Sequence, residues 1–328
     1  MSKKSLFITG GAGYVGAVLV PRLLSDGHKV TVLDLMIYGD DVIDAHPNLK
    51  IVKGDIRDID LVNQIMPGHD TVIHLACISN DPSFELNPDL GRSINLDSFE
   101  PLVKASKDLG IKRFINASSS SVYGIKNEKD VSEEMSLEPL TDYSKFKAEC
   151  ELILTKYQSE DFTTVSVRPA TVCGYSPRQR LDVVVNILTN LAFHQRKIKV
   201  FGGNQLRPNI HIEDMVEVYC QLIDAPSRMI AGEIFNAGYE NQSVMELAQT
   251  VGNAFENSVE IEVTPSNDDR SYHISSAKIK KLLGFETKHT IADAVRDLKA
   301  AFEEGRLKNP IDNELYYNIR RMQALSLK

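Results

Sequence analysis

The sequence lacks long hydrophobic runs and dense basic blocks, and both absences narrow the choice of function. No stretch approaches the roughly 18 apolar residues of a membrane span, and the apolar run near the N-terminus is too short for a signal peptide. The formal net charge is −8 without any cluster of lysine and arginine, which argues against a nucleic-acid partner. We therefore expect a cytoplasmic protein that binds neither membranes nor nucleic acid.

Cysteines are few and scattered. Cys77, Cys150, Cys173 and Cys220 lie in apolar contexts and match no metal-ligand spacing, so we expect free thiols in a reducing compartment and no bound metal. The rest of the composition is that of a soluble globular protein, with 328 residues, 42% of them hydrophobic and 25% charged. This length predicts two domains, or one large domain with a lobe.

Short strands alternate with helices near the N-terminus. This alternation is typical of a parallel sheet covered on both faces. We expect an α/β fold with a Rossmann-type doubly wound parallel sheet and a smaller mixed α/β C-terminal substrate lobe. The predicted strands are 5–9, 29–34, 49–54 and 71–76, and the predicted helices are 15–25 and 59–66.

The first loop carries the clearest local motif. Gly10-Gly-Ala-Gly-Tyr-Val-Gly16 contains both GxGxxG and GxxGxxG between a predicted strand and a predicted helix. Glycines there permit a tight turn and let backbone N–H groups approach a pyrophosphate at the helix N-terminus. Asp34 follows Gly16 by 18 residues, at the end of the next strand. A carboxylate there accepts both ribose hydroxyls of NAD and repels the 2′-phosphate of NADP, so the motif predicts NAD.

A tyrosine and a lysine form a second motif. Tyr143 and Lys147 are four residues apart, so they share one face of a helix predicted to run to about Tyr157. A free tyrosine titrates near pH 10, and work as a base near neutrality needs a shift of about three units, or ~4 kcal/mol. One positive charge about 4 Å away supplies roughly that much at an effective dielectric of about 20.

Together these motifs resemble an extended short-chain dehydrogenase/reductase of the NAD-dependent nucleotide-sugar epimerase/dehydratase family, over nearly the whole chain. The matching elements are Thr9 to Gly16, Asp34, Gly54-Asp-Ile56, His74-Leu-Ala76, Asn95, Ser118 to Gly124, Tyr143 to Lys147, Arg168-Pro169 and His211-Ile-Glu-Asp214. The resemblance implies NAD as cofactor and a nucleotide-diphosphate sugar as substrate. It also implies a homodimer joined through helices near 95–108 and 143–157.

The resemblance implies three sets of site residues. The catalytic set is Ser119, Tyr143 and Lys147. The cofactor set is Gly10, Gly13, Tyr14, Val15, Gly16, Asp34, Asp55, Ile56, Leu75, Ala76, Asn95, Tyr143, Lys147 and Pro169. The substrate set is Ser79, Asn80, Ser119, Ser120, Cys173, Arg178, Arg207 and Arg270.

Four consecutive serines limit the chemistry. Ser119 stands at the family's catalytic Ser/Thr position, and a structural capping role fits Ser118 and Ser121 better. Ser120 and Ser121 occupy the positions at which the family's 4,6-dehydratases carry an Asp-Glu pair. Unperturbed hydroxyls are poor bases near neutral pH, so the segment argues against 4,6-dehydration. It also lacks the acidic residue expected of a decarboxylase.

The second half is expected to bind the substrate. Residues 1–173 and about 209–238 would form the NAD-binding domain, and about 174–208 and 239–328 the nucleotide-sugar-binding lobe. In this lobe 181–195 is a predicted helix. Arg207 and Arg270 would bind the substrate diphosphate bidentately, with Arg178 as a third candidate. Departures from the family pattern at Cys173, Pro208 and the segment after Arg168 leave the sugar and the nucleotide open.

These features favour an NAD-dependent nucleotide-sugar 4-epimerase. Tyr143, assisted by Ser119, would remove the proton of the sugar 4-hydroxyl, and the 4-hydride would pass to NAD and return to the other face after the 4-keto sugar rotates. A nucleotide-sugar 4-dehydrogenase or 4-keto reductase requires the same residues and stays open. A non-catalytic dinucleotide-binding sensor is the third hypothesis. A role in surface-polysaccharide precursor synthesis rests on the resemblance alone.

Overall fold

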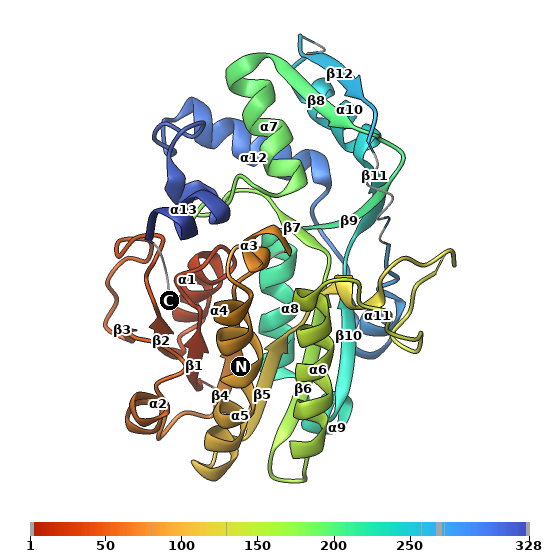
Figure 1. The fold of residues 1–328 in the computed structure, drawn as a ribbon. Coiled ribbons are helices and arrows are strands. Elements are labelled where there is room, and N and C mark those ends of the chain that lie inside the picture. The colour runs from red at the N-terminus through yellow and green to blue at the C-terminus, as the bar shows by residue number, and fades with distance from the viewer. Residues whose placement is uncertain are drawn as a thin grey trace.

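A seven-stranded parallel sheet forms the centre of the larger part of the molecule (Figure 1). The computed structural model describes residues 3–325 except 80, 129, 257, 267–270 and 272. The strand order is β10-β6-β5-β4-β1-β2-β3, and every neighbouring pair is parallel. This arrangement confirms the predicted Rossmann-type α/β fold. The strands are β1 (Ser5–Thr9), β2 (Lys29–Asp34), β3 (Leu49–Lys53), β4 (Thr71–His74), β5 (Arg113–Ala117), β6 (Thr163–Pro169) and β10 (Glu233–Ala237).

The direction of strand order reverses between β1 and β4. Such a switch point is where open α/β sheets bind their ligands, outside the carboxyl ends of the strands. Thr9 and His74 pair in register there, and their side chains hydrogen-bond at 2.8 Å in the interior. Burial lowers the pKa of His74 to about 3, so the imidazole is a neutral structural link between the two strands.

Helices cover both faces of the sheet. The helices α1 (Gly16–Ser25) and α8 (Ile212–Asp224) pack together on one face, and α2 (Ile59–Ile65), α5 (Phe99–Asp108) and α6 (Asp142–Tyr157) cover the other. Pro101 lies in the first turn of α5, where its missing N–H costs no helical hydrogen bond. Shorter elements are α3 (Asp81–Glu85), α4 (Pro88–Arg92), η1 (Ser93–Asp97), η2 (Ser120–Tyr123), α9 (Ser227–Ile230) and α11 (Ala277–Leu283).

A smaller α/β lobe lies beyond the carboxyl ends of the strands (Figure 1). It has a three-stranded sheet, β11-β9-β7, and a parallel pair, β8 with β12. The predicted helix 181–195 begins at Val184, after the extended Val183. No helix in the described ranges is long and apolar enough to cross a membrane. The elements are β7 (Thr171–Cys173), β8 (Lys197–Phe201), β9 (Leu206–His211), β11 (Glu240–Ser243), β12 (Glu260–Thr264), α7 (Val184–Gln195), α10 (Val244–Ala254) and α12 (Ile291–Glu303).

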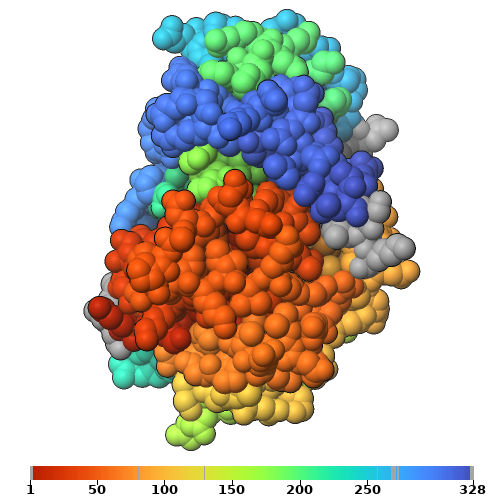
Figure 2. All heavy atoms as spheres, turned by 90° about the vertical axis from the view of Figure 1, so that its left-hand side faces the viewer, coloured from red at the N-terminus to blue at the C-terminus, as the bar shows by residue number. Residues whose placement is uncertain are grey.

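The last elements return toward the first domain. After η3 (Glu314–Tyr316), helix α13 (Asn318–Leu325) packs near α3. Arg321 donates a hydrogen bond to the carbonyl oxygen of Ile37. In Figure 2 the dark-blue C-terminal segment lies directly against the orange N-terminal part of the chain.

A buried ion pair joins α6 to β6. Arg168 donates to Glu151 from Nε at 2.9 Å and from Nη2 at 2.6 Å, and both side chains are almost fully buried. Arg168 also donates to the Tyr123 hydroxyl at 2.7 Å, and that hydroxyl donates to Asn236 at 2.7 Å. Glu151 accepts a further hydrogen bond from Ser118. The network therefore connects α6, β6, β10 and the serine segment.

The Glu151→Gln substitution should destabilise the fold, because it leaves the Arg168 guanidinium buried without its counter-charge. Removing one partner of a buried pair costs about 3 kcal/mol or more of unfolding free energy. Urea denaturation of the full chain measures this loss. The matched control is Glu149→Gln, an exposed change on the same helix, for which about 0.5 kcal/mol or less is expected. Equal losses in the two variants would contradict the role of the pair.

Candidate active site

A cavity of about 550 Å³ opens at the carboxyl ends of the strands, between the sheet and the lobe. This volume is in the range of sites that bind small molecules and cofactors. Residues of the glycine-rich loop, the ends of β2 and β4, the serine segment and the lobe all line it. The lining includes these predicted site residues: Gly10, Gly13, Tyr14, Val15, Gly16, Asp34, Asp55, Ile56, Leu75, Ala76, Ser79, Ser119, Ser120, Tyr143, Pro169, Arg178 and Arg207.

The glycine-rich loop brings backbone close to the cavity. Gly10 has φ +73°, and a Cβ there would lie 2.5 Å from the backbone nitrogen of Ala76. Only glycine therefore fits at this position. Helix α1 begins after Val15, and no side chain caps its first N–H groups. The Ala17 and Val18 nitrogens donate to the carbonyl oxygens of Gly13 and Val15 at 2.9 and 3.1 Å, and the positive end of the helix dipole suits a phosphate.

Asp34 ends β2 at the edge of the cavity. Its Oδ2 accepts a hydrogen bond from the Ala12 nitrogen at 3.0 Å, and its Oδ1 accepts one from the Met36 nitrogen at 2.8 Å. Burial raises the pKa of the carboxyl above its usual value, while the two backbone donors oppose that shift. Each oxygen keeps acceptor capacity for a ligand hydroxyl, since a carboxylate oxygen has two acceptor sites.

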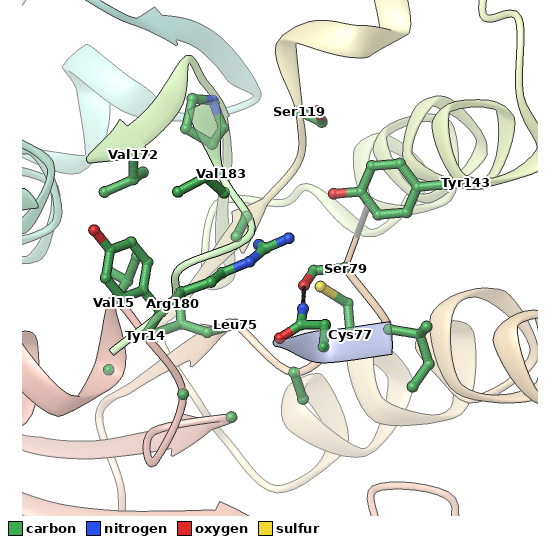
Figure 3. A pocket seen from close by; sticks show the side chains of 18 of the residues that line it. Tyr14, Val15, Leu75, Cys77, Ser79, Ser119, Tyr143, Val172, Arg180 and Val183 are labelled. Atoms are coloured by element: carbon green, nitrogen blue, oxygen red, sulfur yellow. Dashed lines mark hydrogen bonds between the residues drawn. The ribbon is translucent and has the colours of Figure 1, made fainter. Parts of the chain in front are cut away.

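Tyr143 and Lys147 lie on α6, which a Thr141–Ser144 capping box begins. The Tyr143 side chain points into the cavity (Figure 3). Lys147 lies behind it, with Nζ 5.9 Å from the Tyr143 ring centroid and donating to the Ala117 carbonyl oxygen at 2.7 Å. Burial raises the pKa of Tyr143 to about 12, and the charges of Lys147 and Arg180 pull it down. The phenol is thus a proton donor whose charged form depends on nearby cations.

The serine segment differs in one respect from the prediction. Ser119, and neither Ser118 nor Ser121, is the capping residue: it precedes η2, and its Oγ accepts from the Ser121 nitrogen at 3.2 Å. Its Oγ also lies 2.8 Å from the Ser121 Oγ. Ser118 instead donates to buried Glu151. Ser119 caps the turn because its backbone is extended and it directly precedes η2. Ser119 nevertheless also lines the cavity.

Two predicted residues lie elsewhere. Cys173 was expected to contact the substrate, and this prediction is wrong: the side chain is fully buried in the lobe core, with Sγ 3.5 Å from the Ile210 carbonyl oxygen. Cys173 ends β7 and packs into the hydrophobic core of the lobe, while Thr171 and Val172 line the cavity. Asn95 is also buried outside the lining, and its amide bonds both the nitrogen and the carbonyl oxygen of Ile78. Asn95 therefore fixes the position of Ile78, which lines the cavity.

The remaining predictions divide between the cavity wall and residues outside the described ranges. Asn80 and Arg270 lie outside the described residues. Arg207 lines the cavity and donates to the Leu206 carbonyl oxygen at 2.9 Å. Ser79 lines it too and accepts from the Asn318 amide at 2.9 Å.

Sequence reasoning missed several lining residues, of which Arg180 is the most prominent. Figure 3 shows Arg180 reaching toward Tyr143, and its Nε donates to Asp182 at 2.7 Å. The Arg-Gln-Arg-Leu-Asp run at 178–182 was the available signal. Asn318 had none, because the fold alone brings it to the cavity. Other missed lining residues are Tyr38, Cys77, Asp81, Thr171, Val172, Val183, Met215 and Tyr219.

The described part of the cavity offers no metal centre. Across the ranges that the structure describes, no three His, Cys, Asp or Glu side chains are arranged to hold a metal ion. The carboxylates that line the cavity already have partners on the protein. Asp55 pairs with Arg57 at 2.7 Å, Asp81 accepts from Thr141 at 2.6 Å, and Asp182 accepts from Arg180.

Comparison with known proteins places this geometry in context. Residues 6–238 match the family model described as NAD dependent epimerase/dehydratase family. The chain is 28% identical to a dTDP-glucose 4,6-dehydratase of Streptomyces niveus, over 93% of this chain and 96% of the relative. It is 30% identical to a UDP-glucose 4-epimerase of Mycolicibacterium smegmatis, over 88% and 95%.

Solved structures share the fold. A dTDP-glucose 4,6-dehydratase of Streptomyces venezuelae, solved with NAD bound, superposes with a TM-score of 0.84 at 23% identity and covers 94% of this chain and 100% of its own. Both reaction types therefore occur among the proteins that this chain resembles.

The Arg180→Gln substitution should raise the pKa of Tyr143, because it removes one of the two charges that favour the phenolate. A higher pKa means that less phenolate is present at any given pH. The acidic limb of kcat/KM against pH is therefore expected to move upward by about half a unit to one unit. Arg196→Gln, an exposed change, is the control. A limb that stays in place in Arg180→Gln would show that Arg180 does not act on Tyr143.

Proposed function

The chain belongs to the NAD dependent epimerase/dehydratase family, and from this premise we propose that it is an NAD-dependent nucleotide-sugar 4-epimerase. NAD is the cofactor of this family, and the cavity fits it. Gly10 leaves room for a close approach to the backbone, and the uncapped N-terminus of α1 offers donors to a diphosphate. Asp34 would accept the ribose hydroxyls, and Asp55 and Ile56 would contact the adenine.

Bound NAD would supply the oxidant for a sugar carbinol and return the hydride afterwards. The protein's part is to move a proton and to orient the sugar. Tyr143 would take the proton of the 4-hydroxyl and return it, with Ser119 bonding the same oxygen. Tyr143 needs nearby positive charge for this, because burial raises its pKa to about 12. Lys147 and Arg180 provide two such charges, and the positive ring of the oxidised cofactor adds a third when it binds.

The observation that carries the proposal is the set of groups beside Tyr143. Residues 119–121 offer only hydroxyls, and the lining carboxylates Asp81 and Asp182 are engaged by Thr141 and Arg180. Interconversion of an alcohol and a ketone needs one acid/base, which Tyr143 supplies. Elimination of water across C5 and C6 needs a further acid and base. The arrangement therefore favours 4-epimerisation over 4,6-dehydration.

The direct test is incubation with UDP-, dTDP- and GDP-hexoses, followed by NMR of the products and absorbance at 340 nm. A 4-epimerase yields the 4-epimer with no accumulation of NADH. A 6-deoxy-4-keto product would show dehydration, and stoichiometric consumption of NAD or NADH would show a net 4-dehydrogenase or reductase. A sample that binds NAD but converts none of these sugars would favour a non-catalytic role or another substrate.

The Tyr143→Phe substitution should lower kcat by about 10²- to 10⁴-fold, the usual contribution of a general acid/base. The ring stays in place, so the dinucleotide carried through purification should remain at the wild-type level. Denaturing the protein and quantifying the released dinucleotide provides this check. Full activity in Tyr143→Phe would refute the role of the phenol.

We also propose a homodimer joined through α5 and α6. The two helices pack side by side, and Leu152 on α6 is 64% exposed, unusually high for a leucine. A second copy would cover it in a four-helix contact. Leu152→Glu should therefore give a monomer in sedimentation at micromolar concentration, whereas Leu140→Glu, an exposed leucine outside both helices, should not. A wild-type chain that sediments as a monomer would exclude the dimer.

A further inference from the structure

Arg178 is a buried cation with unused hydrogen-bonding capacity. The residue is 4% exposed, lines the cavity and stacks on Tyr38, with Cζ 3.4 Å from the ring centroid. One arm, Nη2, donates to the Asn318 side chain at 2.7 Å. Nε is buried without a hydrogen-bond partner among the described residues. Burying a guanidinium with an unmade hydrogen bond costs free energy, and an anion bound in the cavity would accept that hydrogen bond.

The surroundings of Arg178 belong to the cofactor half of the cavity. Two residues before it, Ser176 donates to the carbonyl oxygen of Tyr14 in the glycine-rich loop at 2.8 Å. The Tyr14 hydroxyl donates in turn to the Gly174 carbonyl oxygen at 2.7 Å. Tyr38, on which Arg178 stacks, follows Asp34 by four residues. Arg178 therefore lies between the loop that suits a phosphate and the loop that follows the ribose-binding carboxylate.

The neighbouring arginine, Arg180, acts on Tyr143. Arg180 reaches toward Tyr143 in Figure 3 and favours the tyrosine's charged form. Arg178 instead favours the charged form of Asp34. The two arginines both act on Tyr38, but Arg178 also favours the charged form of Asp34 and Arg180 that of Tyr143.

We propose that Arg178 binds the diphosphate of NAD, and that Asn318 of α13 holds the guanidinium in position for it. This rests on the NAD site, and it reassigns Arg178 from the substrate to the cofactor. The nucleotide sugar also carries a diphosphate, which is the competing source of the same chemistry. The stacking of Arg178 on Tyr38 and the hydrogen bond from Ser176 to Tyr14 favour the cofactor.

Asn318 makes three contacts that support this position. Besides accepting from Arg178, its amide donates to Ser79 at 2.9 Å and its backbone nitrogen donates to Asp182 at 2.8 Å. The side chain is 2% exposed. Because Ser79 belongs to the first domain and Asp182 to the lobe segment, Asn318 fixes Arg178 relative to both.

The test compares the binding of ligands with and without a diphosphate. Competition against bound NADH fluorescence, with the full chain and no sugar present, gives dissociation constants for ADP, adenosine and UDP. Arg178→Gln should weaken ADP binding by about 10- to 100-fold, because a charge-assisted hydrogen bond to phosphate is lost. Adenosine binding should change by less than about twofold, which also shows that the variant is folded.

Control variants separate the alternatives. Arg196→Gln, an exposed change outside the cavity, should leave ADP binding unchanged, and Asn318→Ala should weaken ADP binding with the same selectivity as Arg178→Gln but to a smaller extent. Equal weakening of ADP and adenosine would overturn the proposal, as would weakening of UDP with ADP unchanged, which would assign Arg178 to the substrate. None of these measurements involves turnover, so failure of the 4-epimerase assignment would leave their outcome interpretable.

Discussion

The arrangement of the site depends on the buried pair between Glu151 and Arg168. Glu151 lies on α6, two turns after Tyr143 and one after Lys147, and Arg168 lies at the end of β6 next to Pro169. Ser118, the first residue of the serine segment, donates a hydrogen bond to the same carboxylate. The pair therefore sets the distance between the helix that carries the acid/base and the turn that carries the hydroxyls. An ion pair costs desolvation, but its fixed geometry suits a position where a shift of 1 Å would separate the reacting groups.

Electrostatics in the cavity follow from the burial of Tyr143. Burial raises the pKa of the phenol and so lowers the fraction of phenolate, yet it also strengthens each cation's effect on the phenol. Lys147 keeps its charge there. Burial lowers the pKa of the lysine, but the nearby Cys77 and Tyr143 raise it above its usual value. A tyrosine base in such a place works only when several positive charges surround it. Two such charges are Lys147 on α6 and Arg180 on the segment after β7.

Patterns that are local in sequence were predictable, and contacts made by distant segments were not. The alternation of strands and helices predicted the sheet, because the apolar runs of β1, β2 and β4 are buried on both faces. The glycine-rich loop, Asp34 and the Tyr143–Lys147 pair were found because their chemistry needs fixed short spacings. Cys173 was misassigned because a sequence does not show which residues of a short strand pack into the core of the lobe, and Cys173 is fully buried there.

The site residues contributed by the lobe were harder to find. Arg180 was overlooked because a run of charged residues usually indicates a solvent-exposed loop. Asn318 reaches the cavity from 239 residues beyond Ser79, and no local pattern encodes a contact of that separation. The capping role of Ser119 was missed because its position in the family pattern assigned it to catalysis, which left capping to Ser118 and Ser121.

The order of assembly follows from where β10 stands in the chain. It pairs with β6 at the edge of the main sheet, but it comes after the first part of the lobe in sequence. During synthesis β6 must remain an open edge until residues 233–237 emerge, and the cavity wall is complete only when Asn318 docks. Such long-range closures slow folding and leave an unpaired strand exposed for longer. Acquisition of the dinucleotide would then mark the last step of maturation, and a chaperone that shields β6 would assist the newly made chain most.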